Sequence, residues 1–442
     1  MKFLMTLYQI QDYGGIINHA EHLARGLRIL GHEVDFRMLV PKYKIGATRE
    51  PKDIEQYRRF GSGFQFHQAN GWYGLPRVPY LETGALWAFK ERCSKYDAVL
   101  WHIPVPTLNK ENKGIHEWTK LYDHGSKNIA IIHDGNLPQL YPHLNHVADH
   151  FHAAVCVHES AMNSGQMLAM PRKLILNPFD TKTADGWTDF HNRNGFAAIQ
   201  VFKAWKRVDT LIRAIPHIGK VGVQPRWGIL NKMIVGGAGI EYRYMTSKDK
   251  CKPQYFNPET GERIWDEALA RGMDYKGTLP SEEVFSHLKK VRLQIDPSFS
   301  KKYAAYGAHF NRTTIEAIIC GAVPMATDWG MKNSSIFLSH HNYIPIPANC
   351  EPKVFAQLIE EAHYNKDWWL RVKENNLHLL KKFDMRGIAQ QYVDLVKSDA
   401  PHHLGPTGHP MPIDIKRCNK NLEFFGLGHS DAATGAQTNL GL

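Results

Sequence analysis

The sequence predicts an α/β protein made of two doubly wound domains. The chain has 442 residues, more than one hydrophobic core usually organises. Short apolar runs alternate with segments whose apolar residues recur at helical spacing, which is typical of parallel sheets covered by helices. This alternation starts twice, with a polar, glycine-containing stretch between the two series. We therefore expect two similar domains.

The first series opens with a strand, a glycine turn, a helix and a second strand. Residues 2–10 are a short apolar run, and Gly14 and Gly15 follow it. Residues 18–31 have apolar side chains at helical spacing and end on glycine, and 32–40 form the next apolar run. This order predicts a βαβ unit of a parallel sheet.

Three further apolar runs, at 95–106, 127–136 and 151–160, are each followed by polar or small residues. In open α/β sheets, ligands bind at the carboxyl ends of the strands. Five polar side chains are expected at this edge: His102, His133, Asp134, His158 and Ser160.

Changes in composition give the domain boundaries. We expect an N-terminal domain over 1–180, a polar linker over 181–195 and a C-terminal domain over 196–383. Amphipathic helices close the second series, the last over 384–399. The tail, 400–442, is rich in Gly, Pro and Asn and is expected to be irregular.

Composition also narrows the class of protein. No apolar run reaches membrane-spanning length and the N-terminus is too polar for a signal peptide, so we expect a cytoplasmic protein. Six cysteines without CxxC pairs or zinc spacing favour a reduced compartment and no structural metal. The net charge of +11 favours a polyanionic partner, and a well-solvated basic surface is the alternative.

The stretch KAWKRVD places Lys203, Lys206 and Arg207 just before and inside the first turn of a predicted helix. The helix dipole disfavours cations at this end. Residues placed against their local preference suggest a task, such as neutralising a pyrophosphate. A basic surface face is the alternative.

Two glycine turns could contact a phosphate. Gly14 and Gly15, and Gly236 and Gly237 of GGAG, follow predicted strands. A glycine turn before a helix presents free N–H groups to an anion. Neither stretch completes GxGxxG, and ordinary turn geometry explains such glycines equally well.

His133 and Asp134 stand together at a predicted strand end. Such a pair could orient a hydroxyl or accept its proton. The competing interpretation is that Asp134 caps a helix.

Glu316 lies on the first turn of a predicted apolar helix, IEAIICG. The helix dipole favours a carboxylate there, so capping explains it. Alternatively, both neighbouring faces are apolar, so the carboxylate is near the interior and needs donors. Vicinal ribose hydroxyls would supply two.

The order of these motifs resembles the GT-B glycosyltransferases, in particular the large retaining family 4 of nucleotide-sugar-dependent enzymes. Ten stretches match in order: the strand–GG–helix start, IIHDGN, VCVHES, ILNPFD, AWKRVDTLIRAI, MIVGGAG, DYKGTLPSEEV, QIDPSF, TTIEAIICGAVPMATDWG and FDMRGIAQQYVDLV. The resemblance implies two Rossmann-like domains facing across a cleft. It also implies that the C-terminal domain binds the nucleotide sugar and that the last helix crosses back to the N-terminal domain.

The same resemblance implies roles for individual residues. Lys206, with Lys203 or Arg207, binds the donor pyrophosphate, Glu316 holds the ribose hydroxyls, and His133 lies near the transferred sugar. The glycines Gly14, Gly15, Gly236 and Gly237 and the residues His309, Phe310 and Asn311 contact the donor. No metal or cofactor is expected apart from the nucleotide-diphosphate sugar. Two positions depart from the family pattern, Ala308 and Val201, where a glutamate and an arginine are usual.

A looser resemblance connects the chain with bacteriophage DNA α-glucosyltransferases. It rests on the His-Asp pair, the Trp-Lys before a helix, the lone glutamate before Cys-Gly and the basic balance. It implies that a hydroxymethylated base in DNA is the acceptor, with His102 and Trp72 or Tyr73 beside it. The alternatives are a glycan or lipid-linked acceptor, a non-catalytic nucleotide-sugar or nucleic-acid-binding module, and a sugar-nucleotide epimerase.

Overall fold

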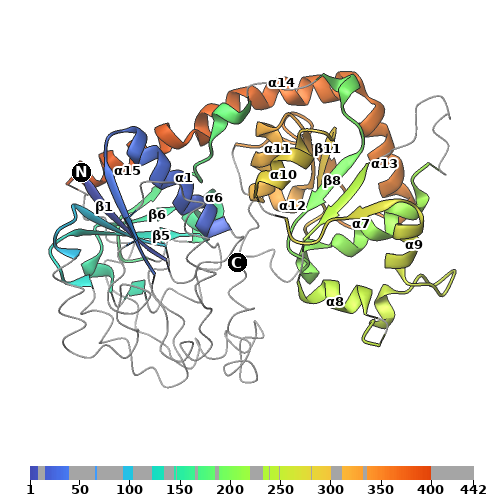
Figure 1. Cartoon of the computed structure of the whole chain (residues 1–442), viewed down its shortest axis with the longest axis horizontal. Coiled ribbons are helices and arrows are strands. Elements are labelled where there is room, and N and C mark those ends of the chain that lie inside the picture. Colours follow the sequence, from blue (N-terminus) through green and yellow to red (C-terminus); the bar gives the residue numbers. More distant parts are fainter. Residues whose placement is uncertain are drawn as a thin grey trace. The chain divides into compact units, whose positions relative to one another are not determined.

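The computed structural model divides the chain into two compact units (Figure 1). Unit 1 comprises Met1–Asp180 and Phe383–Leu442, and unit 2 comprises Thr181–Lys382. The structure describes residues 1–7, 15–38, 65–66, 93–102, 122–133, 144–145, 147–164, 168–184, 189–219, 232–237, 239–247, 249–279, 281–299, 311–331 and 336–399.

Unit 1 contains a parallel sheet of seven strands in the order β3-β2-β1-β4-β5-β6-β7. The strands are β1 (Lys2–Leu7), β2 (Glu33–Met38), β3 (Gln65–Phe66), β4 (Ala98–Trp101), β5 (Lys127–Ile132), β6 (Ala153–Cys156) and β7 (Arg172–Leu174). The order reverses between β1 and β4. In doubly wound sheets, this switch point is where ligands bind, outside the carboxyl ends of the strands.

The described helices of unit 1 are α1 (Gly15–Ile29), the 3-10 turn η3 (Ala148–His150), α6 (Glu159–Ser164) and α15 (Met385–Lys397). Helices α1 and α15 pack together (Figure 1). Leu23 and Tyr392 are fully buried in the core that these helices share with the strands of the sheet. Gly26 allows this approach, because a Cβ there would overlap the carbonyl oxygen of Met385. The last helix thus returns to the first unit, as predicted.

Unit 2 contains a parallel sheet of six strands in the order β10-β9-β8-β11-β12-β13. The strands are β8 (Phe196–Ile199), β9 (Met233–Gly236), β10 (Met273–Tyr275), β11 (Leu293–Asp296), β12 (Val323–Thr327) and β13 (Ile344–Ile346). The order again reverses after the first strand of the unit, between β8 and β11. Two doubly wound α/β units therefore confirm the predicted fold class.

The helices of unit 2 cover its sheet. They are α7 (Val208–Ala214), α8 (Ile240–Thr246), α9 (Ile264–Ala270), α10 (Ser281–Leu288), α11 (Arg312–Ile319), α12 (Asp328–Met331), α13 (Pro352–Tyr364) and α14 (Lys366–Phe383). The described residues of unit 2 also include five 3-10 turns: η5 (Thr181–Ala184), η6 (Phe190–Asn192), η7 (Ala204–Lys206), η8 (Ile215–His217) and η9 (Pro253–Tyr255).

The stretch 181–195, expected to be a linker, is part of unit 2. The ring of Phe190 lies 5.5 Å from that of Trp369. Arg193 is buried and its guanidinium donates to the carbonyl oxygens of Val291 and Cys320. Local composition indicated a linker because these contacts involve residues about 100 or more positions away.

Two further findings concern expectations from composition. The five described cysteines are free thiols, and none of the helices that the structure describes is long and apolar enough to cross a bilayer. The tail, 400–442, lies outside the described residues.

Candidate functional site

Each unit gathers polar side chains at the switch point of its sheet. In unit 2 they are Lys206, Asn311 and Asp296, here called the lysine cluster. In unit 1 they are His19, His102 and His133, here called the histidine cluster. The two clusters are described separately below.

The lysine cluster joins the ends of the two switch-point strands. Lys206 closes η7, shortly after β8, and Asp296 is the last residue of β11. Asn311 precedes the first residue of α11 in extended conformation. Nζ of Lys206 donates to Oδ1 of Asn311, and Nδ2 of Asn311 donates to Oδ2 of Asp296. The asparagine therefore links the cation to the carboxylate.

Burial controls the charge of Lys206. Its side chain is 7% exposed, and its ammonium lies 4.1 Å from the centre of the Trp205 ring. Burial lowers its pKa to about 8, the nearby Asp296 carboxylate opposes this shift, and Lys203 adds to it. The lysine is thus mainly charged at neutral pH but incompletely compensated. Such a buried cation favours an anionic ligand.

The other two cations lie nearby in the chain, and their positions correct the prediction. Lys203 is extended before η7, and Arg207, with φ of 50°, precedes the first residue of α7. No cation of this run lies inside the first turn of α7, which carries Asp209 instead. Lys206 lies in the 3-10 turn and Arg207 directly before α7, so the cations precede the helix and none of them lies within it.

Glu316 is buried in α11, on its second turn rather than its first, because the helix already begins at Arg312. Oε1 of Glu316 lies 3.3 Å from Nε of Arg312. Burial raises the pKa of Glu316, and Arg312 partly opposes that shift. The expectation of an interior carboxylate that needs donors is met in part by this arginine.

The glycines of GGAG have a packing role. Gly236 ends β9, and Gly237 has φ of 129°. A Cβ on Gly237 would overlap the carbonyl oxygen of Gln200. The N–H of Gly237 donates to the carbonyl oxygen of Gly277 at 2.7 Å. These contacts favour turn geometry over phosphate binding for Gly237.

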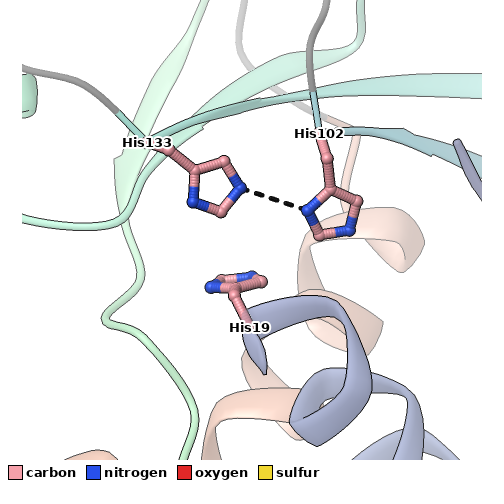
Figure 2. A group of neighbouring side chains, drawn as sticks. All are labelled: His19, His102 and His133. Carbon is pink, nitrogen blue, oxygen red and sulfur yellow. Dashed lines mark hydrogen bonds between the residues drawn. The ribbon is translucent and has the colours of Figure 1, made fainter. Parts of the chain in front are cut away.

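The histidine cluster is built from three elements (Figure 2). His102 directly follows β4, His133 directly follows β5, and His19 lies on α1. Nδ1 of His102 lies 3.1 Å from Nε2 of His133, with the two rings 18° from parallel. The His19 ring stands edge-on to both, with centroids 5.3 Å from His102 and 4.8 Å from His133.

Neighbouring groups hold these imidazoles. His19 Nδ1 lies 2.8 Å from Oδ1 of Asn177. His158 supports His133: its Nδ1 accepts from the N–H of Ala161, so its Nε2 donates to the carbonyl oxygen of His133 at 3.1 Å. Burial, with a contribution from His19, lowers the pKa of His102 well below its usual value. The three rings are therefore held in place by their neighbours, and burial favours the neutral form of His102.

The sequence located His102, His133 and His158 at one edge, and the structure brings all three together there. His19 was missed. It falls on the buried face of α1 with Ile16, Ala20 and Leu23. A histidine inside such an apolar stripe is the signal that could have identified it.

Several predicted residues lie outside the described part of the chain: Gly14, Trp72, Tyr73, Asp134, Ala308, His309 and Phe310. Gly15 is the first residue of α1, Ser160 is in α6, and Val201 follows β8. The proposed contacts of these residues with donor or acceptor remain predictions.

Comparison with known proteins places the fold. No protein-family model matches the sequence, and no curated protein matches it significantly. Among solved structures, HepE from Anabaena in complex with UDP is 15% identical with a TM-score of 0.61, covering 89% of this chain and 99% of that one. An α-glucosyltransferase in complex with UDP and a 13-mer DNA containing an HMU base is 14% identical, with a TM-score of 0.60 and coverage of 90% and 100%.

A third similar structure is TarM from S. aureus, in complex with fondaparinux, α-GlcNAc-glycerol and UDP. It is 12% identical with a TM-score of 0.58, and the match covers 90% of this chain and 100% of that one. All three are GT-B glycosyltransferases. At these identities the likeness establishes the architecture, and the chain therefore has the GT-B fold.

Proposed function

We propose that this protein is a retaining glycosyltransferase that moves a sugar from a UDP-sugar to a hydroxyl group on a hydroxymethylated base in DNA. The observation that carries the proposal is the lysine cluster: a buried cation at the switch point of unit 2, in a GT-B fold. The proposal is further supported by the similar structures, which were solved with UDP or UDP-glucose.

In the donor step, the sugar–phosphate bond breaks and negative charge develops on the leaving diphosphate. Lys206 donates to that diphosphate, aided by Lys203 or Arg207 and by the N-terminus of α11. Glu316 accepts from the ribose hydroxyls. These protein cations replace a metal ion at the donor, so the donor step is metal-independent.

In the acceptor step, the hydroxyl attacks from the face of the leaving group, which retains the configuration of the sugar. The proton passes to a phosphate oxygen of the donor. His133 and Asp134 position the acceptor or the sugar, with His102 beside them. A stacked aromatic side chain, Trp72 or Tyr73, would hold a base taken out of the DNA stack.

Charge supports DNA as the acceptor. The net charge of +11 favours a polyanion, because lysines and arginines that neutralise phosphates release counterions. One similar structure was solved with DNA containing an HMU base. A glycan acceptor is the second candidate, favoured by the similarity to TarM, which was solved with α-GlcNAc-glycerol.

A product assay tests the proposal. The protein is incubated with a panel of UDP- and GDP-sugars and with duplex DNA that carries ordinary or hydroxymethylated pyrimidines, and the digested nucleosides are weighed by mass spectrometry. We expect a mass gain of one sugar on the hydroxymethylated base alone. Lys206→Ala should abolish it, whereas Lys276→Ala, which removes an exposed lysine paired with Asp274, should not.

The other outcomes discriminate between the alternatives. Slow hydrolysis of a nucleotide sugar with unchanged DNA would retain the donor assignment and move the acceptor to glycans. Binding of UDP-sugar without hydrolysis or transfer would indicate a non-catalytic module. Epimerised free or nucleotide-linked sugar would indicate an epimerase.

A further inference from the structure

We propose that His19, His102 and His133 bind one divalent transition-metal ion of the zinc type. The site belongs to unit 1, so it leaves the proposed metal-free donor step in unit 2 unchanged. It departs from the sequence-based expectation of a protein without metal. The proposal rests on the convergence of three imidazoles from three separate elements at the switch point of the sheet.

The distances fit a metal. One nitrogen from each ring lies within 4.8 Å of the other two, the sole such group of histidine, cysteine or carboxylate side chains among the described residues. A tetrahedral zinc ion with Zn–N bonds of 2.0–2.1 Å places its ligand nitrogens about 3.3 Å apart. The His102–His133 nitrogens, at 3.1 Å, already have nearly this separation. The His19 nitrogen lies within 4.8 Å of the other two, so metal binding requires the His19 ring to move toward the pair.

The chemistry of the donors selects the ion. Imidazole nitrogens suit zinc, copper, nickel and iron, whereas magnesium and calcium prefer oxygen ligands. A ligating imidazole must be neutral, and the buried surroundings of His102 favour its neutral form. Three protein ligands leave a fourth tetrahedral position for water or a substrate hydroxyl.

The surroundings of His19 match those of a metal ligand. Ligating histidines usually donate their second nitrogen to an oxygen, which fixes the tautomer. Here His19 Nδ1 meets Oδ1 of Asn177 at 2.8 Å, so Nε2 carries the lone pair. This Nε2 lies 3.4 Å from the hydroxyl of Tyr392, a long contact that the metal would replace.

Metal binding is measured on the full chain without a histidine tag and without UDP-sugar. The protein is stripped with a chelator, and zinc affinity and stoichiometry are measured by competition with a chromophoric chelator. We expect one zinc ion per chain. Cobalt(II) should give the intense visible absorption of a tetrahedral site.

The variants locate the ion. His102→Gln should lower zinc affinity at least about 100-fold, and Asn177→Ala, which keeps all three imidazoles, about 10- to 100-fold. The matched control is His22→Gln, one turn further along α1 with its ring against Phe179, and it should not change the affinity. Circular dichroism of each variant checks the fold.

No zinc bound by the wild-type chain would overturn the proposal, as would equal affinity in the wild type, His102→Gln and Asn177→Ala. Because the donor is absent from this measurement, either result leaves the proposed glycosyl transfer standing. Conversely, a chain that binds zinc but transfers no sugar retains the metal site.

Discussion

The two switch points of this protein have the same topology but opposite chemistry. In unit 2, the lysine cluster places a buried ammonium beside an amide and a carboxylate. In unit 1, the equivalent edge carries three imidazoles, of which His102 is held neutral by burial. The sheets run β3-β2-β1-β4 and β10-β9-β8-β11 through these points, so the backbone order alone does not decide what binds there.

The difference indicates which of the two units is suited to bind an anionic ligand. A buried lysine with an incompletely compensated charge favours an anion such as a diphosphate. Neutral nitrogens favour a hydroxyl or a soft cation and provide no charge to stabilise a phosphate. The comparison supports the proposals that the donor binds in unit 2 and that a cation or hydroxyl binds in unit 1, and the predictions below test them.

Removing the cation of unit 2 should have the largest effect. Lys206→Ala is expected to lower kcat for sugar transfer about 100- to 1,000-fold, because the charge that develops on the diphosphate loses its donor. Steady-state kinetics with the best UDP-sugar measures this. If Lys206→Ala lowers kcat no more than Lys276→Ala does, the lysine cluster does not stabilise the charge on the diphosphate.

Neutralising the buried carboxylate should weaken donor binding next. Glu316→Gln keeps the shape of the side chain and is expected to raise KM for the UDP-sugar about 10- to 100-fold, since hydrogen bonds to a charged group are lost. Glu361→Gln is the control, because Glu361 is exposed on α13. If KM stays constant in Glu316→Gln, the carboxylate pairs with Arg312 and does not bind the donor.

The pH dependence should report the charge of Lys206. Because its pKa is lowered to about 8, the ammonium is present below that pH and lost above it. We expect kcat/KM to fall about tenfold per pH unit well above 8. Lys206→Arg should abolish this fall, since arginine stays charged. Asp296→Asn should shift the fall to lower pH, because the carboxylate raises the lysine pKa.

A fall of activity at high pH that persists in Lys206→Arg would assign the titration to another group. Unit 1 provides the contrast within the same experiment. His102→Gln should leave the alkaline limb where it is, because the histidine cluster does not set the lysine charge.

The smallest effect should come from a helix cap in unit 1. Oδ1 of Asp384 accepts from the N–H groups of Arg386 and Gly387, both at 3.1 Å, at the start of α15. Asp384→Ala should lower the free energy of unfolding by about 1 kcal/mol without changing KM for the donor. Urea unfolding followed by circular dichroism checks this, with Asp394→Ala in the same helix as control. A changed KM for the donor in Asp384→Ala would show that the stability of α15 in unit 1 affects donor binding.

Much of the architecture was predictable from local pattern. A strand buried on both faces is a continuous apolar run, so KNIAII and AAVC were recognisable, and the residue after such a run lies at the ligand edge. This logic located His102 and His133. The cations around Lys206 were found by a different signal, their position at the start of a predicted helix. The resemblance to the GT-B glycosyltransferases, and not this pattern, predicted that α15, although last in the chain, packs with unit 1.

Other features depended on contacts between distant parts of the chain. Asn311 reaches Lys206 across 105 positions, and His19 meets Asn177 across 158. Phe190 and Arg193 are held in place by residues distant in the sequence, and not by their sequence neighbours. Periodicity and turn preference indicate burial and backbone conformation over a few residues, so the sequence alone determined the strands and helices. The hydrogen bonds, pKa shifts and arrangement of ligands at the two sites arise only when folding brings separate strand ends together.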